Sequence, residues 1–142
     1  MKQEDKELLL RDLCARLPYG IKIKTSYDKM DEPIELRFIN PRNESFAIGG
    51  DFTLISGLDF NKYECKPYLF PLSSMTEEQW EEYEFLCIKE TSECIDIYGF
   101  SYTKDNYYDT VESIDYLYKN HIDIRGLIPK ELAIDATNLN IY

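Results

Sequence analysis

The chain of 142 residues has one histidine, His121, and its four cysteines form no CxxC pair. The cysteines are Cys14, Cys65, Cys87 and Cys94. A structural zinc site normally needs four Cys or His ligands at short paired spacings, and only Cys87 and Cys94 lie close together in sequence. We therefore expect no metal and no cofactor. We interpret all four cysteines as buried thiols, each acting as a small hydrophobic side chain.

Long apolar runs and targeting signals are also missing. No apolar run approaches the ~18 residues of a membrane-spanning helix. The N-terminal stretch MKQEDKELLLRD has acids where a signal peptide has a basic region followed by an apolar one. We therefore expect a cytoplasmic protein without a membrane partner, in a reducing compartment where disulfides are rare.

Common catalytic motifs are absent as well. Gly49-Gly50-Asp51 does not fit a phosphate-binding loop, and G-x-S-x-G and H-E-x-x-H occur nowhere. His121, with Asp123 nearby, could act as a general base, because imidazole titrates near neutral pH. It also follows a predicted helix, where a cation or donor stabilises the last carbonyls. We predict no catalytic residue. The alternative is an enzyme whose site is assembled from distant residues, either His121 or converging carboxylates.

Basic residues are scarce relative to acidic ones. The chain has 16 Lys and Arg against 27 Asp and Glu, a net charge of −11. Residues 1–50 are neutral, residues 51–76 carry −1, and residues 77–142 carry −10. This balance argues against direct binding to nucleic acid, which needs clustered Lys and Arg side chains. The acidic second half is typical of a solvated face or of a docking surface for a basic partner.

Local patterns predict three helices. The first spans residues 4–17, and Asp12 and Arg16 fall outside its apolar face. That face consists of Leu10, Leu13, Cys14 and Leu17. The second helix begins at Thr76 with a capping box to Gln79. The third begins near Asp109, with Glu112 three residues on as a second capping box, and ends about Asn120.

Residues 19–66 are typical of β-structure. Short strands are expected at 19–24, 34–39, 46–48, 52–56 and 61–66. Gly49-Gly50 predicts a hairpin turn, Gly57 is expected to end the fourth strand, and Pro67 and Pro71 bracket an expected crossing segment. Residues 94–108 fit a strand or a loop, and Leu132–Ala136 could add a last strand. Residues 1–142 are therefore predicted to form a single α+β domain, an antiparallel β-meander of about five short strands with three helices.

Three blocks stand out from this pattern. They are LLRDLCARLPYG at 9–20, KPYLFPLSSMTEE at 66–78, and NHIDIRGLIPK at 120–130, followed by Leu132-Ala133-Ile134. In this order they resemble a family of small uncharacterised proteins encoded by gut anaerobes and by their phages and prophages, and the resemblance covers most of the chain. It implies no particular activity. Phe70 stands where the family has Arg, and Glu131 where it has Gly, so a role of that arginine does not carry over.

Tyrosine is abundant in the acidic half. Six of the 12 tyrosines fall within residues 98–118. Tyrosine is favoured in protein interfaces because it offers a large contact area at low entropy cost. The predicted protein-binding residues are Tyr98, Tyr102, Tyr107, Tyr108, Asp96 and Asp105.

These observations favour a non-enzymatic accessory protein that binds another protein, and the resemblance implies a protein of the phage or mobile-element type. One alternative is a nucleic-acid mimic that blocks a DNA-binding protein with its carboxylates. A mimic of this kind should bind its partner much more weakly as the salt concentration rises. The enzyme described above is the second alternative. Self-association through an edge strand is a third, and the oligomeric state stays open.

Overall fold

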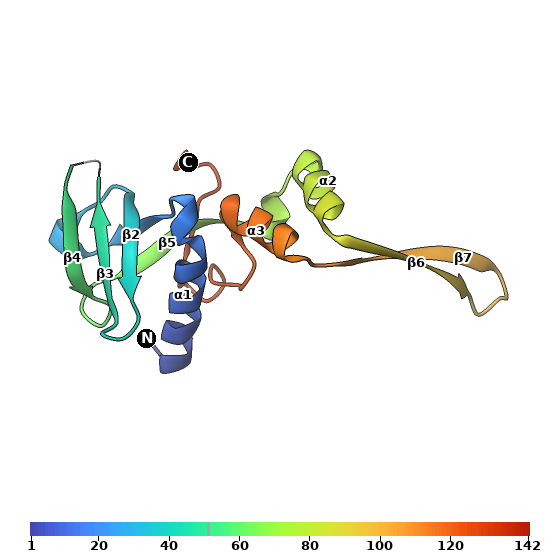
Figure 1. The fold of residues 1–142 in the computed structure, drawn as a ribbon, viewed down its shortest axis with the longest axis horizontal. Helices are drawn as coiled ribbons and strands as arrows, with labels where there is room; N and C mark the ends of the chain where they lie inside the picture. The colour runs from blue at the N-terminus through green and yellow to red at the C-terminus, as the bar shows by residue number, and fades with distance from the viewer. Residues whose placement is uncertain (51) are drawn as a thin grey trace. The chain divides into compact units, whose positions relative to one another are not determined.

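The computed structural model describes residues 1–50 and 52–142. Within them the chain forms three α-helices and nine strands, which confirms the α+β class and the three predicted helices (Figure 1). The helices are α1 (Gln3–Arg16), α2 (Glu77–Leu86) and α3 (Val111–Lys119). The strands are β1 (Lys22–Thr25), β2 (Ile34–Asn40), β3 (Ser45–Gly49), β4 (Leu54–Asp59), β5 (Cys65–Pro71), β6 (Ile88–Ile95), β7 (Ser101–Tyr108), β8 (Ile122–Asp123) and β9 (Ile134–Asp135). None of the helices in the described ranges has the length and apolar character needed to cross a bilayer.

The chain divides into two compact units. The first unit consists of residues 1–74 and 118–142, and the second of residues 75–117. The first holds α1, the seven-stranded sheet and the hydrophobic core. The second holds α2, the two-stranded sheet of β6 and β7, and most of α3.

The sheet of the first unit is mixed and has the strand order β4-β3-β2-β1-β5-β8, with β9 also paired to β5. The first four strands pair in sequence, but β5 lies antiparallel beside β1 rather than beside β4. The second half of β5 pairs in parallel with β8 and β9. The predicted five-stranded antiparallel meander is therefore wrong, because the fifth strand crosses over and recruits strands from the far end of the chain.

Strand β5 runs through the segment that was expected to be a crossing connection. Pro67 pairs with Ile23 of β1, and Pro71 pairs with Asp123 of β8. Proline cannot donate a ladder hydrogen bond, but the Phe70 N–H lies between the two prolines and donates to His121 O at 2.8 Å. Because other residues of β5 supply the ladder, two prolines are tolerated in a strand that joins the two ends of the chain.

The β3–β4 hairpin differs from its prediction at two glycines. Gly49 still pairs with Leu54, so the turn begins later than the predicted Gly49-Gly50, and Asp51 lies outside the described residues. A Cβ on Gly49 would lie 2.1 Å from Thr53 O, so this position requires glycine. Gly57 does not end β4. It has a φ of 73° at a register shift, where an unpaired glycine in the left-handed region forms a β-bulge.

Helix α1 packs against the sheet (Figure 1). Its buried face is shifted by one residue from the predicted one. Leu9 and Leu13 are buried in the core, as expected of an apolar stripe, but Asp12 and Arg16 are buried beside them and Cys14 is exposed. The assignment of Asp12 and Arg16 to the outer face is therefore wrong. A charged pair one helical turn apart can be buried when each partner satisfies the other.

The prediction of four buried thiols holds only for Cys65. All four cysteines are free, with Cys65 buried, Cys14 exposed, and Cys87 and Cys94 half-buried. Burial, and the neighbouring carboxylate of Glu64, raise the pKa of the Cys65 thiol, which disfavours the reactive thiolate. In residues 1–50 and 52–142 no group of three or more Cys, His, Asp or Glu side chains is placed to hold a metal ion.

The two helices of the second unit begin at capping boxes. The Gln79 N–H donates to Thr76 Oγ1 at 3.1 Å, and the Thr76 N–H to Gln79 Oε1 at 3.0 Å, which confirms the first box. The box of α3 uses Thr110 and Ser113 at 2.8 and 3.0 Å, so the predicted Asp109 and Glu112 box is wrong by one residue. Two overlapping sequences fit the same motif, and only the helix register decides between them.

Residues 88–108 form a long two-stranded ribbon. Strands β6 and β7 make eight antiparallel pairs, from Ile88↔Tyr108 to Ile95↔Ser101. This resolves the segment 94–108, which the sequence left open between strand and loop. Among the described residues no third strand pairs with this ribbon, and α2 and α3 leave most of its length uncovered (Figure 1).

Candidate functional site

The six residues predicted to bind a protein all lie in the β6–β7 hairpin. Two are in the turn and four are on β7. Alternate residues of a strand point to opposite faces, so Tyr102 and Tyr108 lie on one face of the ribbon, and Asp105 and Tyr107 on the other. All four predicted tyrosines are exposed. The structure thus gathers the predicted residues on one element but not on one continuous face.

The two predicted carboxylates already have partners inside the hairpin. Asp96 accepts hydrogen bonds from backbone N–H groups of the turn. Asp105 accepts a hydrogen bond from Thr91 Oγ1 at 2.7 Å and pairs with Lys89 Nζ at 3.4 Å. The bond from Thr91, aided by Lys89, lowers the pKa of Asp105. Both carboxylates therefore stabilise the hairpin, and any contact with a partner comes in addition to that role.

Three exposed apolar residues near the turn were missed by the sequence analysis. They are Ile95, Ile97 and Phe100, and they surround Tyr98. The sequence left this segment open between strand and loop, so it did not predict which of its apolar side chains are exposed. The signal that could have identified them is an Asp and a Gly three residues apart, which favour a hairpin turn among these apolar residues.

The helices of the second unit are joined by tyrosine–carboxylate hydrogen bonds. The Tyr116 hydroxyl donates to Glu82 Oε2 at 2.7 Å, and the Tyr83 hydroxyl donates to Asp109 Oδ1. Burial, together with the bond to Glu82, raises the pKa of Tyr116 to about 12, so its hydroxyl stays protonated. These bonds give a structural role to some of the acidic residues and tyrosines of this unit. Phe85 of α2 is nevertheless exposed, and it lines a shallow apolar depression of about 450 Å³.

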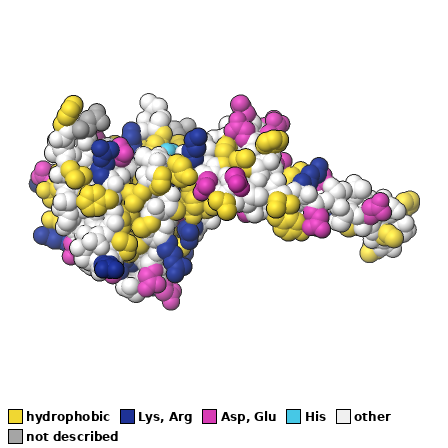
Figure 2. All heavy atoms as spheres, viewed as in Figure 1, with side chains coloured by type: hydrophobic (Ala, Val, Ile, Leu, Met, Phe, Trp, Pro, Cys, Tyr) yellow, Lys and Arg dark blue, Asp and Glu magenta, His cyan; other side chains and the backbone are white. Residues whose placement is uncertain are grey.

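Nearly all of the net charge belongs to the second unit. Residues 75–117 contain twelve Asp and Glu against two Lys, a net charge of −10, whereas the first unit is close to neutral. Figure 2 shows acidic side chains over the helices of this unit and hydrophobic side chains at the far end of the ribbon. The acidic excess that the sequence placed in residues 77–142 is thus confined to a single structural unit.

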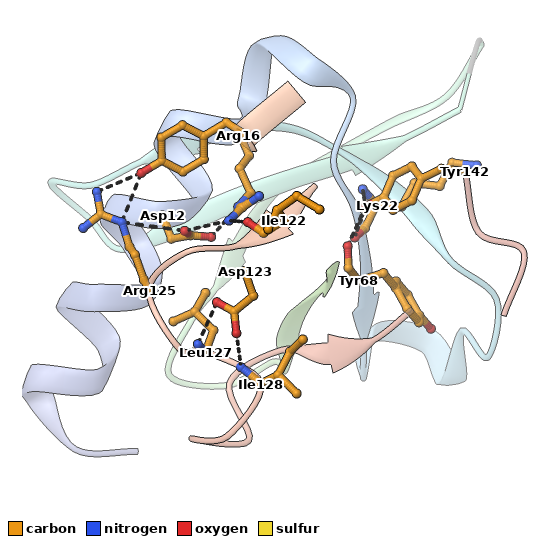
Figure 3. Close-up of polar contacts among 11 residues, drawn as sticks. Asp12, Arg16, Lys22, Tyr68, Ile122, Asp123, Arg125, Leu127, Ile128 and Tyr142 are labelled. Atoms are coloured by element: carbon orange, nitrogen blue, oxygen red, sulfur yellow. Dashed lines mark hydrogen bonds and ion pairs between the residues drawn. The ribbon is translucent and has the colours of Figure 1, made fainter. Parts of the chain in front are cut away.

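A second cluster of polar side chains lies inside the first unit, around Arg16. Its Nε and Nη2 donate to the two carboxylate oxygens of Asp12 at 2.6 and 3.1 Å. Its Nη2 also donates to Ile122 O at 2.7 Å, which ties α1 to β8 (Figure 3). The guanidinium stacks on the Tyr118 ring with 4.9 Å to the centroid, and its Nη1 has no partner among the described residues. This arrangement joins α1 to residues 118–122, near the other end of the chain.

Arg125 extends this cluster towards the surface. Its Nε lies 3.7 Å from Asp12 Oδ1, and its Nε and Nη2 donate to the Tyr118 hydroxyl at 3.2 and 3.1 Å. Asp12 therefore lies between two arginines, one buried and one partly exposed. This flanking positive charge stabilises the buried carboxylate.

His121, the predicted candidate for a general base, is buried and stacked on an aromatic ring. Its imidazole lies 3.7 Å from the Tyr142 ring, with an angle of 12° between the planes. Burial lowers the pKa of His121 to about 4, and the positive charges of Arg16 and Lys22 add to this effect. The side chain is therefore neutral near pH 7, which argues against the predicted role as a cation at the helix end.

Asp123, the expected neighbour of His121, is committed to the backbone. Its two carboxylate oxygens accept hydrogen bonds from the N–H groups of Leu127 and Ile128, both at 2.9 Å (Figure 3). The side chain of His121 instead packs against Tyr142, whose hydroxyl donates to Tyr68 O at 2.9 Å. These contacts favour a packing role for the cluster over proton transfer between His121 and Asp123.

The resemblance of the three sequence blocks to small proteins of gut anaerobes and their phages stays a prediction. The chain matches no protein-family model, no curated protein and no solved structure.

Proposed function

We propose that this chain is a non-enzymatic accessory protein that binds a basic protein partner through residues 75–117. The observation that carries this proposal is the composition of the second unit. It holds a net charge of −10 and nine of the 20 aromatic residues, yet it buries only Met75, Ser113 and Leu117. Exposed aromatic residues among like charges are what an unoccupied interface presents.

The physical reason is that this unit gains little from its own packing. An isolated two-stranded hairpin is at best marginally stable in water. Twelve carboxylates in one small unit also repel one another. A basic partner would relieve this repulsion and cover the exposed rings. Such a partner would also associate quickly, because opposite net charges steer the encounter.

A nucleic-acid mimic is the second candidate, and the same net charge favours it. A mimic would place its carboxylates where phosphates lie and would use them directly. In this unit, however, Glu77 and Glu78 lie in the first turn of α2, and Asp96 and Asp105 are bonded within the hairpin. The exposed apolar side chains also have no counterpart on a phosphate backbone. These observations support a protein-binding surface with mixed chemistry.

The test is affinity capture with two charge-matched variants. The full chain is immobilised and exposed to a lysate of the organism that encodes it, at low and at high salt. One variant carries the changes Glu81→Gln, Glu84→Gln, Glu90→Gln and Glu93→Gln in the second unit, where all four side chains are exposed. The control carries Glu4→Gln, Glu7→Gln, Asp31→Asn and Glu32→Gln in the first unit, also at exposed positions.

We expect a stoichiometric basic partner whose capture falls with the second-unit variant and not with the control. The loss should be greater at low salt, because screening already weakens the ionic part at high salt. Equal capture by both variants, or recovery of no stoichiometric partner, would contradict the proposal. Capture that high salt abolishes completely would favour the mimic.

A further inference from the structure

The turn between β6 and β7 is held together by one carboxylate. Asp96 Oδ1 accepts hydrogen bonds from the backbone N–H groups of Tyr98 and Phe100, each at 2.9 Å. The Asp96 N–H donates to Phe100 O at 3.0 Å, and the Gly99 N–H donates to Asp96 O at 3.1 Å. Gly99 has a φ of 83°, in the left-handed region that glycine adopts without strain. These bonds pre-organise residues 96–100 in one conformation.

This pre-organised turn presents large apolar side chains to water. The exposed fractions are 74% for Ile95, 92% for Ile97, 80% for Tyr98 and 71% for Phe100. We call these four residues the hairpin tip. Hairpin turns are usually made of Gly, Asn, Asp and Ser, so four large apolar residues at this place need an explanation. Their exposure shows that they contribute little to the packing of their own unit.

The hairpin tip has the properties of an interface anchor. Anchors are large apolar or aromatic side chains that enter a desolvated pocket and supply most of the binding energy. A rigid anchor binds more tightly because its conformational entropy is lost before binding. The hydrogen bonds of Asp96 provide this rigidity, and the ribbon carries the anchor on two paired strands.

The charge around the hairpin tip favours a basic surface on its partner. Glu90 and Glu93 lie on the ribbon below the tip, and Lys89 is paired with Asp105, which leaves Lys104 as the opposing charge on β7. The whole unit carries −10. A surface that receives this tip must be apolar at its centre, and it must be basic around the centre to avoid repulsion.

We propose that the hairpin tip inserts into an apolar pocket on a partner protein whose rim carries Lys and Arg side chains. This inference rests on the proposed function and adds a division of roles within it. The tip supplies the lasting contact, whereas the carboxylates of the unit steer the encounter and orient it. Phe100, Ile97 and Tyr98 are the side chains most directly presented by the turn.

A second copy of the chain is a less suitable occupant. The first unit does contain a cavity of about 260 Å³ that is lined by Lys6, Lys62 and Lys66 among other residues. However, Lys6 is paired with Glu44 at 2.8 Å and Lys66 with Glu64 at 3.2 Å, so the chain offsets much of this positive charge itself. The observations therefore favour a different protein, and self-association becomes an outcome of the test.

The experiment compares two triple variants of the full chain in the capture assay. The tip variant carries Ile97→Ser, Tyr98→Ser and Phe100→Ser. The control carries Phe38→Ser, Phe52→Ser and Leu54→Ser, at exposed apolar positions of the first unit. We expect the tip variant to bind the partner about tenfold more weakly or worse, at both salt concentrations, since truncating anchors removes non-ionic energy. The affinity of the control variant for the partner should stay within about twofold of that of the wild type.

Two further measurements address the geometry of the site. Asp96→Asn removes the charge but keeps an oxygen that accepts the turn hydrogen bonds, so it should retain binding. Asp96→Ala removes the acceptor and should weaken binding. A photo-crosslinking side chain at position 98 should attach to an apolar segment of the partner flanked by Lys or Arg. Circular dichroism of each variant checks that the fold is retained.

The outcomes separate the two proposals. If the tip variant captures as much partner as the wild type, or if the crosslink falls on a polar surface without bases, the tip inference is wrong and the proposed function stands. If the wild type captures no stoichiometric partner, both are wrong. If the wild type self-associates by light scattering and the tip variant does not, the occupant is a second copy, which overturns the inferred foreign partner.

Discussion

Asp12 and Arg16 form an ion pair in which neither side chain is exposed to solvent, with Arg16 Nε 2.6 Å from Asp12 Oδ2. The two residues lie one turn apart on α1, and the arginine also reaches Ile122 O of β8. The pair therefore holds a helix from the start of the chain against a strand near its end. Its effect on stability depends on both partners being present, because either charge alone would be buried without compensation.

Removal of one partner of this pair should be strongly destabilising. We expect Asp12→Ala to lower the free energy of unfolding by about 3–5 kcal/mol, since it leaves the Arg16 guanidinium buried without its carboxylate. Urea denaturation measures this change. The neighbouring exposed residue provides the control, and Arg11→Ala should change stability by less than about 0.5 kcal/mol. The double variant Asp12→Leu/Arg16→Met should lose less stability than Asp12→Ala, because it leaves no unpaired charge in the interior. A larger loss of stability in the double variant would contradict this account.

His121 should make the stability of the protein depend on pH. Burial lowers its pKa from 6.5 to about 4, so the unfolded chain takes up the proton at a higher pH than the folded protein does. The contribution of neutral His121 to the free energy of unfolding is therefore fully present above pH 6.5, and it is lost as the pH falls towards 4. We expect a loss of about 2 kcal/mol after allowance for solvent screening.

The check is a comparison with His121→Phe, which keeps a ring beside Tyr142 and cannot titrate. As the pH falls from 6.5 to 4, the wild type should lose stability relative to His121→Phe, because only the wild type has a histidine that takes up a proton on unfolding. Because the chain has one histidine, its NMR titration is unambiguous. A midpoint near 6.5 in the folded protein would refute the burial argument.

The start of α3 offers a test of the helix register. Thr110 Oγ1 accepts from the Ser113 N–H at 3.0 Å and donates to Leu86 O at 2.7 Å, whereas Glu112 is exposed. Thr110→Ala should cost about 1 kcal/mol or more of stability, because it removes the cap of the helix. Glu112→Ala should cost only a few tenths of a kcal/mol through the helix dipole. Thermal denaturation of the two variants distinguishes them, and equal losses would favour the cap at Asp109.

Two adjacent glycines provide a matched pair for the β3–β4 hairpin. A Cβ at Gly49 would collide with Thr53 O, while a Cβ at Gly50 has no atom within 4 Å. We expect Gly49→Ala to destabilise the protein by about 2–3 kcal/mol, because the backbone must shift to remove the overlap. Gly50→Ala should be close to neutral. Chemical denaturation measures both, and a neutral Gly49→Ala would show that the two strands can separate without cost.

Local patterns were sufficient to predict the helices and most of the strands. The capping box at Thr76 and Gln79 was confirmed because it depends on residues three positions apart. Helix α1 was placed within one residue at each end, but its buried face was shifted, because the predicted apolar stripe ran through Cys14 whereas the buried stripe contains Asp12 and Arg16. A rule that assigns charged residues to the surface does not predict a buried ion pair whose two members compensate each other's charge.

Long-range pairing was beyond these patterns. Nothing near Cys65–Pro71 shows that this strand lies beside β1 and receives β8 and β9, since its partners lie tens of residues away in both directions. Its two prolines even argued against a strand. The candidate surface shows the same limit, because the predicted tyrosines were found on the hairpin but the apolar residues of its turn were not recognised.

The sequence by itself determined where the charge is concentrated, that α2 begins at a capping box, and that tyrosines accompany the acid. These are properties of composition and of neighbouring residues, and folding does not change them. Only the tertiary structure decided that Asp12 and Arg16 are buried, that His121 is neutral, and that Asp96 holds a turn with exposed apolar side chains. Burial and exposure depend on which distant segments pack together, and that packing is what the local pattern does not contain.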